Sequence, residues 1–310
     1  MKVAFVFPGQ GSQSVAMMKS FAALAGVRET FSMASDAIGQ DLWKLVEEGP
    51  AEELNLTVNT QPVMLTAGVA LFRAWEREHG VPPVISAGHS LGEYSALVTG
   101  NAIDFSDAVP LVRFRAQAMQ DAVPAGAGAM AAVLGLDDDV VRALCLEASR
   151  GNEAVEAANF NSPAQVVIAG NMGAVERAME IAKARGAKRA IMLPMSVPSH
   201  CSLMRPAADR MRERLNSIKI TVPAIPVLHN ADVRSATSAD SVRDALVRQL
   251  YQPVRWVDTI RAIVAAGSTH IVECGPGKVL AGLTKRIAPD VRSLSFGDEP
   301  AFREALAALK

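Results

Sequence analysis

The chain has 310 residues, of which half are hydrophobic and a fifth are charged, and its formal net charge is −1. This length allows a full hydrophobic core in one or two domains. The near-neutral charge argues against nucleic acid as the main partner, and no apolar run reaches the ~18 residues that a membrane span needs.

The three cysteines stand far apart, at positions 145, 201 and 274. Their odd number and wide spacing favour neither a disulfide framework nor a metal site, so we expect reduced thiols. The N-terminal Met1-Lys2-Val3 leads directly into a strand-like run, without the features of a signal peptide. We therefore expect a cytoplasmic protein with no metal, no membrane partner and no nucleic-acid partner.

Residues 2–7 (KVAFVF) form an apolar run that predicts a buried strand ending at Pro8. The following loop, residues 9–13 (GQGSQ), lacks the Gly-Lys-Ser/Thr of a P-loop and the third glycine of a dinucleotide-binding turn, so a nucleotide site is not expected. The alternative is that its glycines bring backbone N–H groups to a cleft, with Gln10 or Gln13 adding amide donors.

Apolar residues at helical spacing predict helices over residues 27–38 and 61–79, joined by a polar, Glu-rich connection through residues 47–50. Residues 84–87 (VISA) then suit a short buried strand. Residues 93–98 (EYSALV) suit a helix that ends before a glycine.

Residues 88–92 (GHSLG) match the pattern G-x-S-x-G between that strand and that helix. This context predicts a nucleophile elbow, in which a sharp turn exposes the serine hydroxyl. Gly88 and Gly92 let the strand and the helix approach closely, and the N–H of Leu91 is placed to face a developing oxyanion. The alternative is an ordinary glycine-rich turn with a structural serine. We favour Ser90 as a nucleophile.

A further helix is predicted from Asp104 or Ser106 to about residue 121. Arg115 lies four residues before Met119 on this helix, so one face can look into a cleft, whereas Arg113 points elsewhere. The spacing leaves open whether Arg115 faces a site or forms a surface ion pair.

From residue 126 the pattern becomes strand, helix, two strands, helix and strand, the β-α-β-β-α-β order of a ferredoxin-like unit. We interpret residues 127–195 as a small domain inserted into a larger one. We expect residues 1–126 and 196–310 to form that larger domain. A cleft between two domains is a usual place for a site.

The larger domain resumes with predicted helices over residues 202–218, 238–251 and 256–266. Strands are predicted over residues 225–228 and 270–273. Gly275-Pro276-Gly277 opens a last helix that runs to residue 287, and a final strand follows near Val291.

A serine nucleophile needs a base within hydrogen-bond reach, most often a histidine, and the chain has five. His79 ends a surface helix, and His89 lies inside the elbow, where the residue before the nucleophile points away and packs. His200, His229 and His270 follow the serine, which is the chain order of hydrolase folds. His270 begins a strand, whereas His200 and His229 both follow strands. The spacing does not decide between those two.

The group that orients the histidine is also left open by the spacing. Asp232 and Asp258 are candidate acids, and a backbone carbonyl would also serve. No triad acid can be assigned from these residues alone.

Several segments together resemble the malonyl-CoA:acyl carrier protein transacylases of bacterial type II fatty acid synthesis. They span nearly the whole chain in the family's order, and no functional position departs from the family pattern. The matching segments are residues 7–13 (FPGQGSQ), 88–93 (GHSLGE), Arg115 with Met119-Gln120, 159–163 (NFNSP), 197–201 (VPSHC), 249–251 (QLY), 253–254 (PV) and 273–277 (ECGPG).

The resemblance implies an α/β hydrolase-like catalytic domain with a parallel sheet, formed by residues 1–126 and 196–310, and a ferredoxin-like insertion of residues 127–195. It implies Ser90 as the acyl-accepting nucleophile and His200 as general base and acid, oriented by the backbone carbonyl of Gln249. The other implied site residues are Gln10 and Leu91, which supply the oxyanion N–H groups, and Arg115, which binds the malonyl carboxylate.

The implied reaction is a ping-pong transfer. The serine attacks malonyl-CoA, CoA leaves, and the phosphopantetheine thiol of acyl carrier protein then removes the malonyl group. No metal or redox cofactor is required, and we expect a monomer whose partners are acyl carrier protein and malonyl-CoA/CoA. The competing interpretations are an acyltransferase of the same fold in polyketide synthesis or malonate decarboxylation, a serine (thio)esterase, and a carrier-docking module without activity.

Overall fold

The computed structural model describes residues 1–195 and 197–309, which form two separate β-sheets. The strands of the first sheet are β1 (Val3–Phe7), β2 (Ile85–Gly88), β7 (Val227–Leu228), β8 (His270–Glu273) and β9 (Arg292–Ser295). They are all parallel and lie in the order β7-β2-β1-β8-β9. The mixed α/β class with a parallel sheet, predicted from the sequence, is thereby confirmed.

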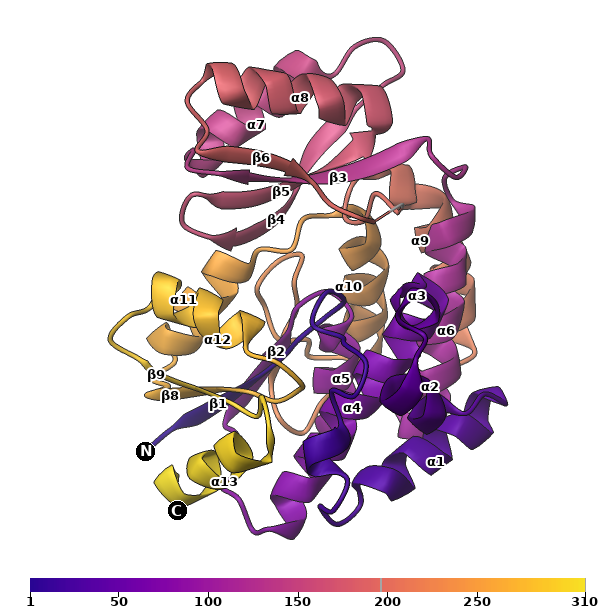
Figure 1. The fold of residues 1–310 in the computed structure, drawn as a ribbon, viewed down its shortest axis with the longest axis vertical. Coiled ribbons are helices and arrows are strands. Elements are labelled where there is room, and N and C mark those ends of the chain that lie inside the picture. The colour runs from indigo at the N-terminus through magenta and orange to yellow at the C-terminus, as the bar shows by residue number, and fades with distance from the viewer. Residues whose placement is uncertain (196, 310) are drawn as a thin grey trace.

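Helices cover both faces of this parallel sheet, in the lower part of the molecule in Figure 1. They are α1 (Val27–Ile38), α2 (Leu42–Glu48), α3 (Ala51–Asn55), α4 (Thr57–Arg77), α5 (Gly92–Thr99), α6 (Phe105–Asp121), α9 (Arg205–Asn216), α10 (Ala239–Tyr251), α11 (Trp256–Ala265), α12 (Val279–Ile287) and α13 (Glu299–Ala308), with short 3-10 turns at Lys19–Phe21 and Ser202–Met204. None of the helices in the described residues combines the length and the apolar character needed to cross a membrane.

Strand β1 lies at the centre of the parallel sheet and is buried on both faces, which explains its uninterrupted apolar sequence. On one face Phe5 packs against Trp75 of α4, with ring centroids 5.6 Å apart. On the other face Ala4 and Val6 share a core with Trp256 of α11. The strand is thereby fixed, and its carboxyl end holds the glycine-rich loop beside the end of β2.

The second sheet lies above the first in Figure 1. Its strands β3 (Gly128–Leu134), β4 (Val155–Ser162), β5 (Gln165–Asn171) and β6 (Arg189–Met192) are antiparallel, in the order β4-β5-β3-β6. Helices α7 (Asp138–Ala148) and α8 (Met172–Ala184) cover its outer face. The edge strand β4 is hydrogen-bonded to the segment between α10 and α11. Phe160 N donates to Val254 O at 2.9 Å, and Val254 N donates to Ala158 O at 2.8 Å.

Two segments contain helices where the sequence analysis predicts none. The Glu-rich connection forms α2 and α3, with the side chain of Asp41 capping α2 by accepting from Lys44 N at 2.9 Å. The helix ending at residue 287 is not the last one, since α13 follows β9. Phe302, Ala305 and Leu306 of α13 are buried at helical spacing, a pattern that the sequence already contains. The predicted domain join at residue 196 lies outside the described residues.

The carboxyl end of β8 carries a buried acid, Glu273, at the start of α12. Its Oε2 accepts a hydrogen bond from Ala281 N at 2.8 Å, while Oε1 has no partner among the described residues. Burial raises the pKa of Glu273 to about 7, although the N–H groups at the start of α12 act in the opposite direction. Glu273 therefore exchanges its proton near neutral pH in the folded protein.

We expect Glu273→Gln to remove a pH-dependent loss of stability. Because the folded-state pKa of about 7 lies above the ordinary 4.5, the stabilisation by protonated Glu273 is complete below about pH 4.5 and is lost as the pH rises through 7. The free energy of unfolding of the variant relative to the original protein should rise by up to about 3 kcal/mol across this interval. Urea denaturation from about pH 5 to about pH 8 measures the difference, and Glu52→Gln, an exposed acid, is the control. A pH-independent difference would contradict the assignment.

Candidate active site

Ser90 lies at the tight turn between β2 and α5, with a left-handed φ of 51°. The two glycines of the motif are required by close backbone approaches. A Cβ on Gly88 would lie 1.9 Å from the carbonyl oxygen of Gly92, and one on Gly92 would lie 2.0 Å from Phe7 O. The predicted strand–turn–helix context of Ser90 is thus present.

The strained turn is held by Asn230, which follows β7. Ser90 N donates to Asn230 Oδ1 at 2.7 Å, and Asn230 Nδ2 donates to Gly88 O at 2.6 Å. One buried amide thus satisfies both the N–H of the serine and the carbonyl oxygen two residues before it. Sequence reasoning missed Asn230, although its position beside the candidate base His229 was the available signal.

His200 is the histidine that the fold brings to the serine. Its Nε2 lies 2.7 Å from Ser90 Oγ, and its Nδ1 lies 2.7 Å from the backbone carbonyl oxygen of Gln249. Since a carbonyl can only accept, Nδ1 carries the proton and Nε2 is free to accept one from the serine hydroxyl. His200 is only 2 % exposed.

The surroundings keep His200 neutral. Burial lowers its pKa to about 3, the charge of Arg115 acts in the same direction, and the hydrogen bond to Gln249 acts against them. At neutral pH the imidazole is therefore a base without a proton on Nε2.

The other candidates from the sequence lie elsewhere. His229 Nδ1 lies 2.7 Å from Glu93 Oε1, and both side chains are buried behind the elbow. Asp232 pairs with Arg248, and Asp258 pairs with the arginine three residues before it, so neither acid orients His200. The spacing left His200 and His229 as alternatives, and the fold distinguishes them. His200, on the loop after β6, faces Ser90, whereas His229 faces Glu93.

Arg115 reaches the same serine from α6. Its Nη2 lies 3.3 Å from Ser90 Oγ and donates to Gln249 Oε1 at 2.9 Å, while Nη1 donates to Gln61 Oε1 at 2.9 Å. The side chain is 1 % exposed, so the surface ion pair is wrong. Burial lowers the pKa of Arg115, but a guanidinium stays charged at any ordinary pH. Arg113 points away, toward Ile38 O at 3.5 Å, as predicted.

No acidic side chain in the described residues lies within ion-pair distance of Arg115. Its hydrogen-bond acceptors are two neutral amides and the serine hydroxyl. A buried cation that lacks a direct anionic partner is costly to keep, which is typical of a site prepared for an anionic ligand. Sequence reasoning also missed Gln61 and the side chain of Gln249.

Ser90 opens into a cavity of about 630 Å³ between the two sheets. The loops after β1 and β2 contribute Gln10 and Leu91, whose backbone N–H groups have no protein acceptor among the described residues. Strands β3 and β5 contribute Met130 and Val167 as an apolar wall. The arrangement can therefore hold an acyl group with free N–H donors on the serine side.

His89 lies on the wall of this cavity and not at its catalytic end. Its Nε2 lies 2.8 Å from Asn161 Oδ1 on β4, and its ring lies 5.3 Å from Trp256. The surrounding protein lowers the pKa of His89. The residue links the elbow to the small sheet, in keeping with the packing role predicted for it. No group of three or more potential metal-binding side chains occurs in residues 1–195 and 197–309.

The model of the acyl transferase domain family matches residues 4–291, which include the whole antiparallel sheet and all strands of the parallel sheet except β9 and the first residue of β1. The chain belongs to this family. Malonyl CoA-acyl carrier protein transacylase of Escherichia coli K12 is 55% identical over 304 residues and is covered to 98%, as is this chain.

Solved structures of this acyl transferase family extend the likeness to three dimensions. The acyl-carrier-protein S-malonyltransferase of Burkholderia pseudomallei 1710b is 59% identical, with a TM-score of 0.97, covering 99% of this chain and 100% of its own. A malonyl-transacylase in complex with its type II PKS acyl-carrier protein is 50% identical, with a TM-score of 0.98, covering 99% of this chain and 100% of its own. The whole fold, including the small sheet, is thus shared.

We expect Asn230→Ala to loosen the turn at Ser90. The loss of both hydrogen bonds should lower the free energy of unfolding by about 2 kcal/mol. The misplaced hydroxyl should react with a fluorophosphonate on the order of tenfold more slowly. Denaturant unfolding and the labelling rate test this, with Asn152→Ala, an exposed residue that does not line the cavity, as control. An unchanged labelling rate would rule out a role for Asn230 in positioning the serine.

Proposed function

We propose that this protein transfers the malonyl group of malonyl-CoA to the phosphopantetheine thiol of acyl carrier protein, through a malonyl-serine intermediate on Ser90. The observation that carries the proposal is the Arg115 guanidinium, buried 3.3 Å from Ser90 Oγ and without a direct anionic partner in the described residues. A planar guanidinium binds a carboxylate through two parallel hydrogen bonds. The malonyl group carries such a carboxylate beyond its thioester carbonyl.

In the first half-reaction His200 Nε2 takes the proton of Ser90 Oγ, and Oγ attacks the thioester carbonyl carbon. The oxygen that becomes negative is held by the N–H groups of Gln10 and Leu91. When the carbon–sulfur bond breaks, the CoA sulfur takes the proton from His200. The backbone carbonyl of Gln249 stabilises the imidazolium that exists between these two transfers.

In the second half-reaction the thiol of phosphopantetheine gives its proton to His200 and attacks the malonyl ester. The same N–H groups hold the second oxyanion, and Ser90 leaves with the proton from His200. The protein ends as it began, and the acyl group has moved from one thioester to another. The malonyl-transacylase solved with its type II PKS acyl-carrier protein supports a protein-bound acceptor.

That relative also favours a second candidate, in which the acceptor is the carrier protein of a polyketide pathway and not of fatty acid synthesis. The chemistry at Ser90 is the same in both. A general esterase is disfavoured, because a buried Arg115 beside the nucleophile selects for an anionic acyl group. The proposed chemistry needs no metal or redox cofactor.

We propose a ferredoxin-like small domain, residues 127–195, inserted into a hydrolase-like domain of residues 1–126 and 196–310. The strand order β4-β5-β3-β6 with two helices on one face supports this assignment. The unpaired, buried thiols of Cys145, Cys201 and Cys274 fit a reducing compartment, which supports the cytoplasm. A monomer remains our prediction.

Ser90→Ala is expected to abolish covalent malonylation, because no other side chain takes the place of Oγ. His200→Ala should slow acylation by a factor on the order of 10²–10⁴, the usual contribution of a general base. Mass spectrometry of the protein after incubation with malonyl-CoA and then with holo-carrier protein measures both steps. His270→Ala is the matched control, since that histidine begins β8 and does not line the cavity. Malonate attached to the Ser90→Ala protein would overturn the nucleophile assignment.

Arg115→Ala should lower kcat/KM for malonyl-CoA by about 10²-fold and leave that for acetyl-CoA unchanged or higher, because only the malonyl group carries a free carboxylate. Arg115→Lys should recover part of the loss, since an ammonium keeps the charge but not the paired donors. Steady-state kinetics with both thioesters give the ratio.

The control for this pair of variants is Arg113→Ala, which removes an arginine from the same helix but from outside the cavity. It should leave the malonyl to acetyl ratio unchanged. If the ratio is also unchanged in Arg115→Ala, Arg115 does not bind the acyl carboxylate.

A further inference from the structure

A second buried charge lies behind the elbow, on α5. Glu93 is fully buried, at 0 % exposure, three residues after the nucleophile. Its Oε1 lies 2.7 Å from His229 Nδ1, and its Oε2 accepts from Asn230 N at 2.9 Å and Gln249 Nε2 at 3.0 Å. With donors at both oxygens, the site suits an ionised carboxylate. The reaction proposed above does not use this group.

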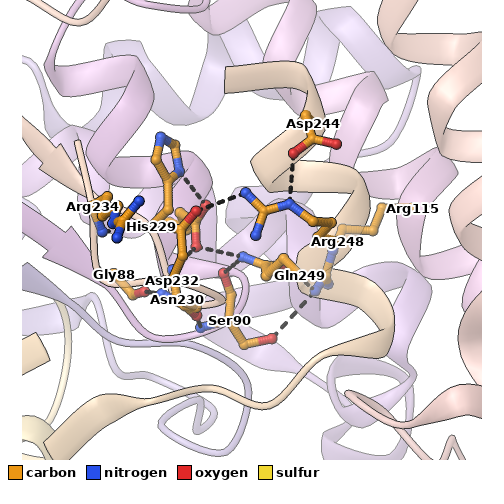
Figure 2. Close-up of polar contacts among 11 residues, drawn as sticks. Gly88, Ser90, Arg115, His229, Asn230, Asp232, Arg234, Asp244, Arg248 and Gln249 are labelled. Atoms are coloured by element: carbon orange, nitrogen blue, oxygen red, sulfur yellow. Dashed lines mark hydrogen bonds and ion pairs between the residues drawn. The ribbon is translucent and has the colours of Figure 1, made fainter. Parts of the chain in front are cut away.

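The side chain of Gln249 connects this anion to the buried cation. Its Oε1 accepts from Arg115 Nη2 at 2.9 Å, and its Nε2 donates to Glu93 Oε2 at 3.0 Å. Figure 2 shows the Gln249 amide between Arg115 on one side and Asn230 and His229 on the other. The amide dipole is aligned with its oxygen toward the positive charge and its nitrogen toward the negative one. This alignment is the favourable one for a neutral group between two opposite charges.

We propose that Glu93 is the counter-charge of Arg115 and acts on it through the amide of Gln249, as a positioning residue for the acyl-binding arginine. The proposal rests on the proposed function for the identity of the ligand, but not for the pairing itself. Its consequence is an ion pair separated by one amide group.

The separation has a specific use. A direct ion pair would occupy the donors of Arg115 and would have to break for each malonyl group that binds. An arginine with no anion in the interior would be too costly to bury. The amide between the charges lowers that cost and leaves the direct position open, so that the substrate carboxylate can take it.

The orientation of Gln249 also matters for the nucleophile and its base. Gln249 Nε2 donates to Ser90 O at 2.9 Å, and the backbone carbonyl of the same residue orients His200. Glu93 accepts hydrogen bonds from the side chain of Gln249 and from the backbone N–H of Asn230. It therefore helps to position both residues that hydrogen-bond to the backbone of Ser90. A buried acid that only filled space would not be coupled to Arg115.

A double-mutant cycle on the full chain without ligand tests the pairing. Glu93→Gln is isosteric and removes the charge, and Arg115→Met removes the opposite charge at similar volume. Glu93→Gln should lower Tm by about 4 °C or more alone, and by less than about half of that in the Arg115→Met background. The reason is that the double variant leaves neither buried charge uncompensated. Equal shifts in the two backgrounds would overturn the proposal.

Glu273→Gln is the matched control, because it replaces another fully buried acidic side chain, one that makes no contact with Arg115. Its Tm shift should be the same with and without Arg115→Met. If Glu93→Gln alone does not fold, the double variant with Arg115→Met must fold for the proposal to stand. Failure of both to fold would count against it.

A binding measurement separates this proposal from the proposed function. In the Ser90→Ala background, where no acyl-enzyme forms, Glu93→Gln should lower the dissociation constant of malonyl-CoA by about threefold or more. It should change the dissociation constant of acetyl-CoA by less than about twofold. Calorimetry measures both dissociation constants. An equal change for both thioesters, or none, would overturn the counter-charge role. If instead Ser90→Ala binds both thioesters alike and Arg115→Met changes neither, the proposed function fails while the ligand-free cycle still decides the pairing.

Discussion

The left-handed turn at Ser90 is the constraint on which the rest of the site depends. A serine at φ 51° is costly unless its neighbours hold it, and here they come from separate segments of the chain. The side chain of Asn230 accepts a hydrogen bond from Ser90 N, and the side chain of Gln249 donates one to Ser90 O. The glycines on either side of the serine allow the strand and the helix to approach closely. The parallel sheet brings these segments together, because β1, β2 and β7 end at the same edge.

Much of this arrangement could be predicted from the sequence, because some of its causes are local. The uninterrupted apolar run of β1 and the G-x-S-x-G pattern around Ser90 can each be recognised from consecutive residues. The apolar spacing of residues 27–38 predicts helix α1 with its observed bounds, because this spacing is a local signal. The family resemblance added His200 and the Gln249 carbonyl, whose relation to Ser90 no spacing reveals.

The parts that could not be predicted depend on contacts across the fold. His200 and His229 both follow strands, yet only the fold shows that one faces Ser90 and the other Glu93. Asn230 and the side chain of Gln249 carry no motif of their own when read in isolation. Their roles come from hydrogen bonds to residues more than a hundred positions away along the chain. Helix α13 is a different case, because the helical spacing of its apolar residues is visible in the sequence and is by itself a sufficient signal for a helix.

The electrostatics of the cavity link recognition to catalysis. Arg115 contributes to the low pKa of His200, about 3, so the base is neutral. Protonation of His200 beside this positive charge is energetically costly. On the proposed function, the malonyl carboxylate binds Arg115 before the serine attacks and cancels much of that charge. Protonation of His200 then becomes less costly when the correct acyl group is bound. An acetyl group fills the same cavity without this change. The same guanidinium would thus select malonyl groups both by binding them and by making the base more effective once they are bound.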